Sequence, residues 1–374
     1  MKEIVPWMFK YTFTIGKIEK LKTPIRQYLE RYTNNPSLID AIAQHFFTDT
    51  PAFFALSYLK MHSDYYYPKG GTRSIVQALK DFIISNGGVI HTHQEVTSID
   101  IDQKIAYHHE TAYPYDALLW CGDLNAMYRS IQNTTVDYQN IKQKLSQAKG
   151  NDSIFQIYVT VDLPANYYKD KFSGHLFYMP KKEGLSSLKM SEHELLNTLK
   201  QTPISEQENI LLSWLKDFAF KTTYEISVPV VRDETLAPAG KSAVIISTLF
   251  SYDLTIYLSK NNLYDVFKKA FYEAIIDVLD KSLLPGWSSK ITSQILATPL
   301  TIESRLNNTG GAITGWSFSD DIPVESKLFK IARSIETPFP NVYQSSQWSF
   351  SPSGFPTSIV TAKIAANKIK KILK

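Results

Sequence analysis

The chain has 374 residues, of which 44% are hydrophobic and 20% charged, a globular composition that argues against intrinsic disorder. Its 40 Lys and Arg side chains nearly balance 36 Asp and Glu, so we expect no nucleic-acid partner. A single cysteine, Cys121, excludes an internal disulfide and a cysteine-based metal cluster. Because the chain has neither a long apolar run nor the apolar core of a signal peptide, we expect a cytoplasmic protein.

The first part of the chain, residues 1–66, is predicted to be helical because apolar side chains recur at helical spacing. These side chains are Ile25, Leu29, Tyr32, Leu38, Ile42 and Phe46. The stretch from Phe46 to Leu56 is rich in aromatic residues. Packing between helices explains this stretch better than a lipid-lined tunnel does.

A glycine turn at Gly70 and Gly71 then opens a second pattern. The helix predicted after this turn has an apolar face formed by Ile75, Leu79, Phe82 and Ile83. Gly87 and Gly88 end the helix, and a strand is predicted from Val89 through Val96 to Ile101. A hairpin returns through 105–107. A buried strand, 117–121, ends at Gly122 and Asp123, where a new helix can begin.

Strands and helices alternate from about residue 129 to residue 333. Phe155, Ile157, Val159 and Val161 are predicted to share one face of a strand, and 263–278 is predicted to form a long amphipathic helix. The last part of the chain reads as a short strand, a loop rich in Gly and Pro, and a basic helix. A strand, loop and helix start of this kind suits an anionic or electron-rich ligand.

Four blocks of the sequence, 67–123, 225–241, 298–316 and 341–369, occur in the order and spacing typical of one enzyme family. They contain the paired glycines, the Ala-Pro-x-Gly turn at 237–240, the Gly-Gly-Ala-Ile-Thr-Gly-Trp segment at 310–316 and the final strand, loop and helix. Together they resemble the phytoene desaturase, carotenoid isomerase and retinol saturase family of FAD-dependent oxidoreductases.

The resemblance implies an α/β fold with α+β elements, in which an incomplete FAD-binding, Rossmann-like domain is interleaved with a substrate domain of antiparallel sheet plus helices. Residues 1–66 would be a helical part of the substrate domain and 67–128 the middle segment of the FAD-binding domain. Residues 129–333 would form the rest of the substrate domain, and 334–374 the C-terminal segment of the FAD-binding domain.

The family's Gly-x-Gly-x-x-Gly unit, which holds the pyrophosphate at a helix N-terminus, is absent from the sequence. We therefore expect an N-terminally truncated chain that binds FAD weakly or not at all by itself and is inactive alone. Its missing unit would come from an N-terminal partner chain or from a longer form of the protein.

The resemblance also implies cofactor-binding residues. They are Val96, Gly122, Asp123, Ser346, Gln347, Gly354, Phe355 and Pro356. Backbone amides near Ser346 and Gln347 would meet the flavin, and Val96 would contact the adenine through its backbone. Many relatives carry glycine where this chain has Ser346. Asp123 could equally be a helix N-cap.

Two further patterns have simple explanations. His91, His93, His108 and His109 fall on both arms of the predicted hairpin, but no carboxylate set accompanies them, so we expect solvent-facing histidines and no metal. The lysine-rich helix 363–374 is expected to present a solvated face, with peripheral contact to an anionic membrane as the alternative.

The resulting hypothesis is a desaturase, saturase or isomerase that uses FAD to act on a carotenoid, polyene or other isoprenoid-like apolar small molecule. No side chain identifies itself as a catalytic acid or base. The alternative is a non-catalytic remnant, or one half of a split enzyme, that binds lipid or a partner chain without flavin.

Overall fold

The structure is a computed structural model that describes residues 16, 18, 20–61, 66–318 and 321–374. The chain divides into two compact units. Unit 1 comprises residues 1–74 and 154–298, and unit 2 comprises residues 75–153 and 299–374. Each unit combines helices with a sheet, which confirms the predicted mixed α/β class.

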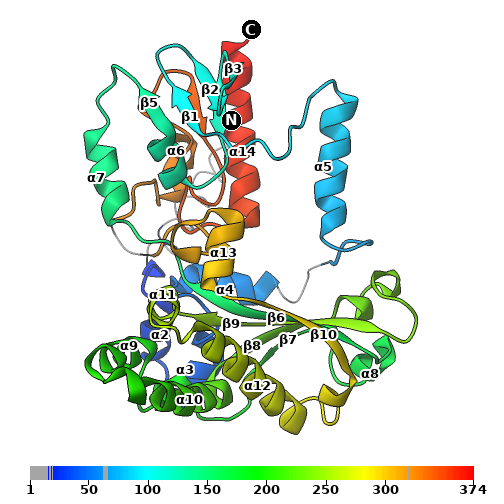
Figure 1. Cartoon of the computed structure of the whole chain (residues 1–374). Helices are drawn as coiled ribbons and strands as arrows, with labels where there is room; N and C mark the ends of the chain where they lie inside the picture. The colour runs from blue at the N-terminus through cyan, green and yellow to red at the C-terminus, as the bar shows by residue number, and fades with distance from the viewer. Residues whose placement is uncertain (1–15, 17, 19, 62–65, 319–320) are drawn as a thin grey trace. The chain divides into compact units, whose positions relative to one another are not determined.

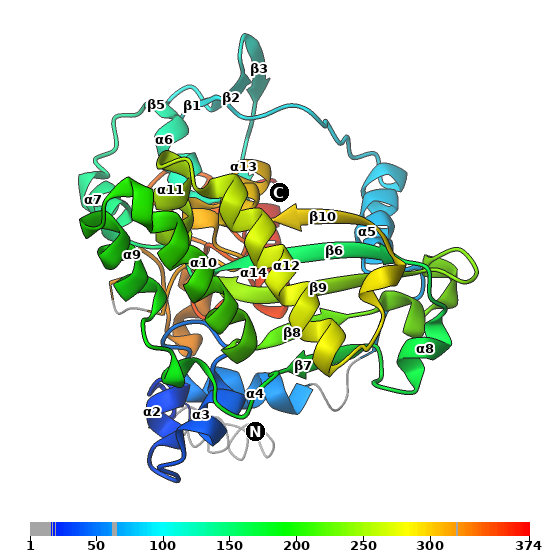
Figure 2. The same cartoon turned by 60° about the horizontal axis from the view of Figure 1, so that its bottom comes forward.

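Unit 1 is built on a five-stranded sheet in the order β10-β6-β9-β8-β7. The pairs β10–β6, β9–β8 and β8–β7 are antiparallel, which confirms the antiparallel sheet expected within residues 129–333. The strands are β6 (Ser153–Val161), β7 (His175–Tyr178), β8 (Tyr224–Ser227), β9 (Ser242–Phe250) and β10 (Ile291–Ala297). Figure 2 shows α10 and α12 lying across one face of this sheet.

The core of unit 1 lies between that face and the helices. Phe155, Ile157, Val159 and Val161 are all buried there, which confirms their predicted shared face. The helices are α2 (Ile25–Leu29), α3 (Pro36–Ala43), α4 (Ala52–Met61), α8 (Ala165–Lys169), α9 (Glu192–Gln201), α10 (Ile204–Lys221), α11 (Tyr252–Lys260) and α12 (Tyr264–Ser282). The predicted helix 263–278 is therefore α12, whose residues Phe267 and Phe271 pack on the sheet.

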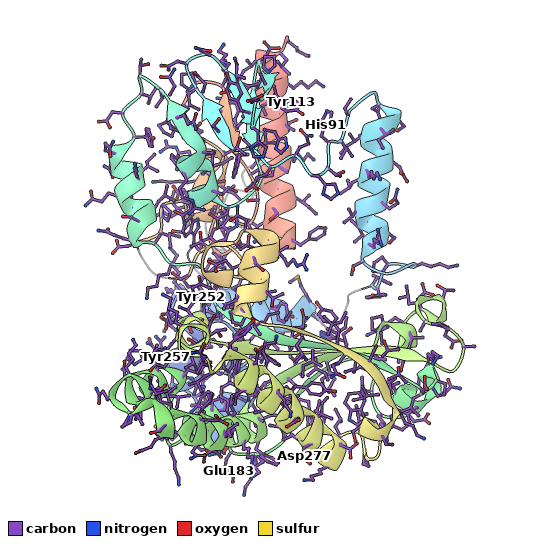
Figure 3. The ribbon with its side chains drawn as sticks, viewed as in Figure 1. His91, Tyr113, Glu183, Tyr252, Tyr257 and Asp277 are labelled. Carbon is purple, nitrogen blue, oxygen red and sulfur yellow. The ribbon has the colours of Figure 1, made fainter. Side chains whose placement is uncertain are left out.

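Hydrogen bonds tie the helices of unit 1 to one another and to the loops. The hydroxyl of Tyr257, a residue labelled on α11 in Figure 3, donates to Oε1 of Gln207 on α10 at 3.3 Å. Asp40 on α3 is fully buried, pairs with Arg26 at 2.6 Å and accepts the amide of Ser186 at 3.0 Å. Phe46, Ala52 and Ala55 of the aromatic stretch are buried in a small core of α2, α3 and α4, whereas Phe53 is only half-buried and Leu56 is exposed.

Unit 2 contains a four-stranded sheet, β3-β2-β1-β5, and a separate parallel pair, β11–β4. The strands are β1 (Ser98–Asp100), β2 (Ile105–His108), β3 (Thr111–Pro114), β4 (Leu118–Trp120), β5 (Ile131–Asn133) and β11 (Val342–Gln344). The helices are α5 (Arg73–Ser85), α6 (Leu124–Ser130), α7 (Gln139–Gln147), α13 (Pro299–Leu306) and α14 (Phe355–Ile372), all labelled in Figure 1. The hairpin predicted between β1 and β2 is confirmed.

Two predictions for unit 2 need correction. Residues 89–97 form no strand, because pairing with β2 begins only near Thr97, whose amide donates to the carbonyl of Tyr107. The predicted strand therefore shortens to β1. In addition, the predicted buried strand 117–121 is only half-buried as β4, and Cys121 is exposed.

The apolar face predicted for α5 is exposed to solvent. The helix has no buried residue, and its large apolar side chains include Val76, 66% exposed, Leu79, 59% exposed, and Phe82, 67% exposed. Its sequence period is correct for an amphipathic helix, yet the described residues provide no surface that covers it.

Candidate functional site

The predicted cofactor loop begins at the carboxyl end of the parallel pair. Leu118 to Trp120 of β4 lie beside Val342 to Gln344 of β11. The amide of Ser345 donates to the carbonyl of Trp120 at 2.8 Å and extends the ladder by one bond. Because parallel strands end at the same edge of a sheet, the segment after β4 and the loop after β11 leave the pair together.

Ser346, the first residue after this ladder, has a backbone conformation that favours glycine. Its φ is +140°, a region that residues with a side chain rarely adopt. Its side-chain oxygen accepts the amide of Trp348 at 3.1 Å, and its carbonyl accepts the hydroxyl of Ser349 at 2.9 Å. These bonds hold the loop in a tight turn. In the sequence, the only sign of this turn is that many members of the family it resembles carry glycine at this position.

A second block of the sequence lies directly against this turn. A Cβ on Gly315 would overlap the carbonyl oxygen of Gln347, so the close approach of the two backbones requires glycine. Next to it, Nε1 of the buried Trp316 donates to the carbonyl of Trp348 at 2.8 Å. The two indole rings meet edge to face, with centroids 4.9 Å apart.

Asp123 connects a third sequence block, 67–123, to the block that contains Gly315. Its Oδ1 accepts the amide of Asn125 at 2.7 Å, so it is the N-cap of α6. Its Oδ2 accepts the amide of Thr309 at 2.6 Å, and the side chain is buried. The N-cap alternative is thus confirmed for the carboxylate. A cofactor contact of Asp123 stays a prediction.

The loop presents hydrogen-bond donors that no described residue accepts. The half-buried amides of Ser346 and Gln347 have no acceptor in the part of the chain that the structure describes. Within the same residues, Nε1 of Trp348 is buried and also lacks an acceptor. A buried donor without a partner costs free energy, about 1–3 kcal/mol, which a bound acceptor would recover.

The start of α14 adds positive polarity to this loop. Gly354 precedes the helix without a side-chain cap, and Pro356 lies in the first turn. Uncapped first-turn amides carry partial positive charge. No residue from Ser345 to Gly354 is titratable, so the donors of the loop are neutral and independent of pH. Such a set fits the carbonyl and phosphate oxygens of a flavin nucleotide.

The other predicted cofactor residues make fewer contacts with the loop from Ser345 to Gly354. Val96 lies just before β1 and packs on the apolar core that also contains Trp348. Gly122 is exposed beside Trp120. Phe355, 62% exposed, and Pro356, also exposed, lie at the beginning of α14. Sequence reasoning did not assign Gly315, Trp316 or Trp348 to the site, although all three fall within the matching blocks.

The four histidines of unit 2 belong to no group of three potential metal ligands among the described residues. The His91 ring lies 5.7 Å from the ring of Tyr113 (Figure 3), and the rings of His108 and His109 are 4.6 Å apart. The prediction that His91 and His93 lie on an arm of the hairpin is wrong, because residues 89–97 form no strand.

Burial affects the ionisation of two side chains near this region. Burial raises the pKa of Tyr128, so its phenol stays neutral at physiological pH. Cys121 is exposed as a whole residue, but protein atoms at the end of β4 partly desolvate its thiol and raise the pKa of that group. Neither shift makes the group a base at neutral pH.

The comparisons with known proteins show the fold. An oxidoreductase from Methanosarcina mazei is 13% identical, with a TM-score of 0.56, over 92% of this chain and 68% of that chain. Wild-type putrescine oxidase bound to putrescine is 11% identical, with a TM-score of 0.57, over 100% and 75%. Cyclohexylamine oxidase from Brevibacterium oxydans is 9% identical, with a TM-score of 0.52, over 100% and 76%.

No family model matches the sequence, and no curated protein matches it either. The fold that the chain shares with these solved oxidoreductase and oxidase structures is shown by the structural similarity alone. Membership of the phytoene desaturase family is not shown. In addition, no described helix has the length and apolar content needed to cross a bilayer.

Proposed function

We propose that the protein is an FAD-dependent oxidoreductase and that the loop from Ser345 to Gly354 holds part of the cofactor. The observation that carries this proposal is the set of unused donors, the amides of Ser346 and Gln347 and Nε1 of Trp348, beside the uncapped start of α14. FAD, when bound, would supply the hydride acceptor. The residues of the loop would orient it, and the helix start would favour the added negative charge of its reduced form.

For the substrate, we propose a polyene or other isoprenoid-like apolar molecule, converted by desaturation, saturation or isomerisation. The support is the resemblance of the four sequence blocks, three of which meet at the cofactor loop through Asp123, Gly315 and Ser346. The fourth block is tied to the glycine turn in unit 1, where the amide of Gly70 donates to Oδ2 of Asp233 at 2.7 Å. The block pattern thus corresponds to physical contacts.

The exposed face of α5 supports a further part of the proposal. A helix with this many exposed apolar side chains is typical of a surface that packs on another element. The similar solved structures are also longer, since this chain covers 68–76% of three of them. We propose that a dinucleotide-binding unit with a glycine turn, from the same protein or from a partner chain, covers this face.

Flavin content tests the function. We would titrate FAD into the purified chain and also measure the flavin that copurifies when the chain is coexpressed with a candidate dinucleotide-binding unit. Weak binding alone and one FAD per complex with that unit is the expected result. Tight FAD binding by the chain alone would support the proposed FAD-dependent function and contradict the proposal that a second, dinucleotide-binding unit is required. Flavin-free protein in both cases would favour the alternative, a binding protein without flavin.

The contribution of the loop is tested by Trp348→Phe, which removes one indole donor and keeps an aromatic ring. We expect FAD affinity to fall about tenfold, the effect of one lost hydrogen bond in a buried site. A matched control is Trp287→Phe in the core of unit 1, whose Nε1 is also buried without a described partner. Equal FAD affinity in the two variants would show that the indole of Trp348 does not contact FAD.

Peripheral membrane contact is proposed for α14. Its basic end carries Lys363, Lys368, Lys370 and Lys371, and Lys374 follows just after the helix. Ile359 is 53% and Val360 46% exposed on the same helix. Basic and apolar side chains together favour an anionic lipid surface. Cosedimentation with vesicles containing phosphatidylserine, but not with phosphatidylcholine alone, is the expected outcome, and equal recovery with both would contradict it.

A further inference from the structure

The five-stranded sheet of unit 1 has a second face, opposite α10 and α12, that differs from the first. On β6, the buried residues Phe155, Ile157 and Val159 alternate with Gln156 and Tyr158, which point to the second face. The same alternation on β8 and β9 places half-buried polar residues on this face. They are Glu225, Ser227 and Ser247. An ordinary core would have apolar side chains at these central positions.

The polar residues form a line across four neighbouring strands. The hydroxyl of Tyr158 donates to Oε1 of Gln156 at 2.5 Å, and Nε2 of Gln156 donates to the hydroxyl of Ser247 at 2.8 Å. Ser247 lies directly opposite Glu225 in the register of β8 and β9. Oε1 of Glu225 lies 2.9 Å from Nε2 of His175 on β7. The line thus runs from β6 through β9 and β8 to β7.

Aromatic rings surround the carboxylate end of this line. Phe177 lies directly opposite Glu225 in the register of β7 and β8. The centroids of His45 and His175 lie 4.4 Å and 5.4 Å from that of Phe177. Tyr58 on α4 meets Phe177 edge to face at 6.3 Å. The ring faces of Phe177 and Tyr58 are electron-rich and attract cations.

Glu225 remains available to a ligand. Its side chain is 46% exposed, and His175 is the one ion-pair partner it has among the described residues. No described lysine or arginine neutralises it. A carboxylate that is not paired with a lysine or arginine, lies beside aromatic rings and can accept further N–H bonds matches the requirements of an ammonium group.

We propose that this second face of the sheet binds the protonated amine of an organic molecule, with Glu225 accepting its N–H groups and Phe177 contributing a ring face. Gln156, Ser247 and Tyr158 extend the polar line away from the ammonium site. The site goes beyond the proposed function, because it assigns to unit 1 a ligand of its own, an organic ammonium ion. Binding itself does not depend on flavin, so the two proposals can fail separately.

The test is calorimetric titration of the full chain at pH 7 with hexylamine, which is protonated, and with hexanol, its neutral analogue. We expect hexylamine to bind at least tenfold more tightly than hexanol, since hydrogen bonds to a charged group are the stronger ones. Equal binding of both ligands, or binding of neither, would overturn the proposal. This comparison uses the unaltered protein and therefore does not depend on the folding of any variant.

Variants then locate the site. Glu225→Gln keeps the shape and the contact with His175 but removes the charge, so hexylamine affinity should fall tenfold to a hundredfold, roughly the effect of one charged hydrogen bond. The matched control is Glu208→Gln, an exposed position on α10, which covers the opposite face. Unchanged hexylamine affinity in Glu225→Gln, with an unchanged melting temperature, would rule out this carboxylate.

Discussion

At the scale of single residues, the cofactor loop shows how a backbone requirement and a side-chain contact compete. Ser346 occupies a φ of +140°, which costs of order 1–3 kcal/mol for a residue with a Cβ. Its hydroxyl recovers part of this cost by accepting the amide of Trp348 at 3.1 Å. The site therefore tolerates serine at a position where the resemblance favours glycine.

The substitution Ser346→Gly should be neutral or slightly stabilising, because it relieves the strain and loses one hydrogen bond of about 1 kcal/mol. Ser346→Ala keeps the strain and loses the bond, so it should destabilise the protein by about 1 kcal/mol. Urea unfolding of the two variants checks the order. Greater stability of the alanine variant would contradict the strained turn.

Gly315 is the second residue with a sharp prediction. Ala at this position would place its Cβ on the carbonyl oxygen of Gln347, so the loop must move. We expect Gly315→Ala to lower the free energy of unfolding by about 1–3 kcal/mol, as overpacking does. The control is Gly354→Ala, where the nearest atom to a Cβ is Pro356 Cδ at 3.9 Å and little loss is expected. Similar losses in both variants would show that the contact is unimportant.

At the scale of elements, capping residues determine where several helices begin. Asp123 starts α6 and Ser251 starts α11 through hydrogen bonds from side-chain oxygens to backbone amides. Helix α9 begins with a capping box, in which Ser191 accepts the amide of Glu194 and Glu194 accepts the amide of Ser191 at 2.7 Å. The capping box of α9 includes the carboxylate of Glu194.

The capping box gives α9 a pH-dependent contribution to stability. Hydrogen bonds from the backbone and hydroxyl of Ser191 lower the pKa of Glu194 below its ordinary value of 4.5. Since the folded-state pKa is lower, the contribution is present above pH 4.5 and is lost as the pH falls through the folded-state pKa. The urea midpoint of the unaltered protein should exceed that of Glu194→Gln at pH 7.

The same difference should shrink at acid pH, because protonated glutamate and glutamine are then similar. Because Glu194 is exposed, the effect will be small, and paired measurements on the two proteins are needed. A difference in midpoint that stays constant from pH 7 to acid pH would show that the charge of Glu194 contributes nothing to the capping box.

At the scale of the whole molecule, we expect the apolar face of α5 to contribute to association with a second unit and not to the folding of the chain itself. Exposed side chains contribute little to folding, so the double substitution Leu79→Lys and Phe82→Lys should leave the melting temperature of the chain nearly unchanged. It should lower binding of a hydrophobic dye, because the apolar face loses its largest members. It should also abolish the gain in flavin on coexpression with a dinucleotide-binding unit. A large drop in melting temperature would show that the chain itself covers this face.

A matched surface control for that experiment is Gln77→Lys with Lys80→Gln on the polar side of α5. This pair keeps the charge of the helix and leaves the apolar side chains in place. Flavin gained on coexpression should survive in the control. Loss in both double variants would indicate damage to the helix and would leave no role for its apolar face.

The sequence by itself determined the periodic features of this protein. The strand face of Phe155 and Ile157, the helix α12 and the hairpin after β1 were all predicted, because each depends on local spacing of apolar residues. The order of the four blocks also indicated the fold that the solved structures show. Local patterns and motif order are properties of the chain and need no tertiary contact.

Only the tertiary structure decided which of these features are covered and which remain available. It showed that the apolar face of α5 is exposed, that residues 89–97 form no strand, and that Asp123 is committed to α6 and Thr309. It also aligned Gln156, Ser247 and Glu225 across separate strands. Their positions depend on register between segments far apart in the chain, which local propensity does not encode.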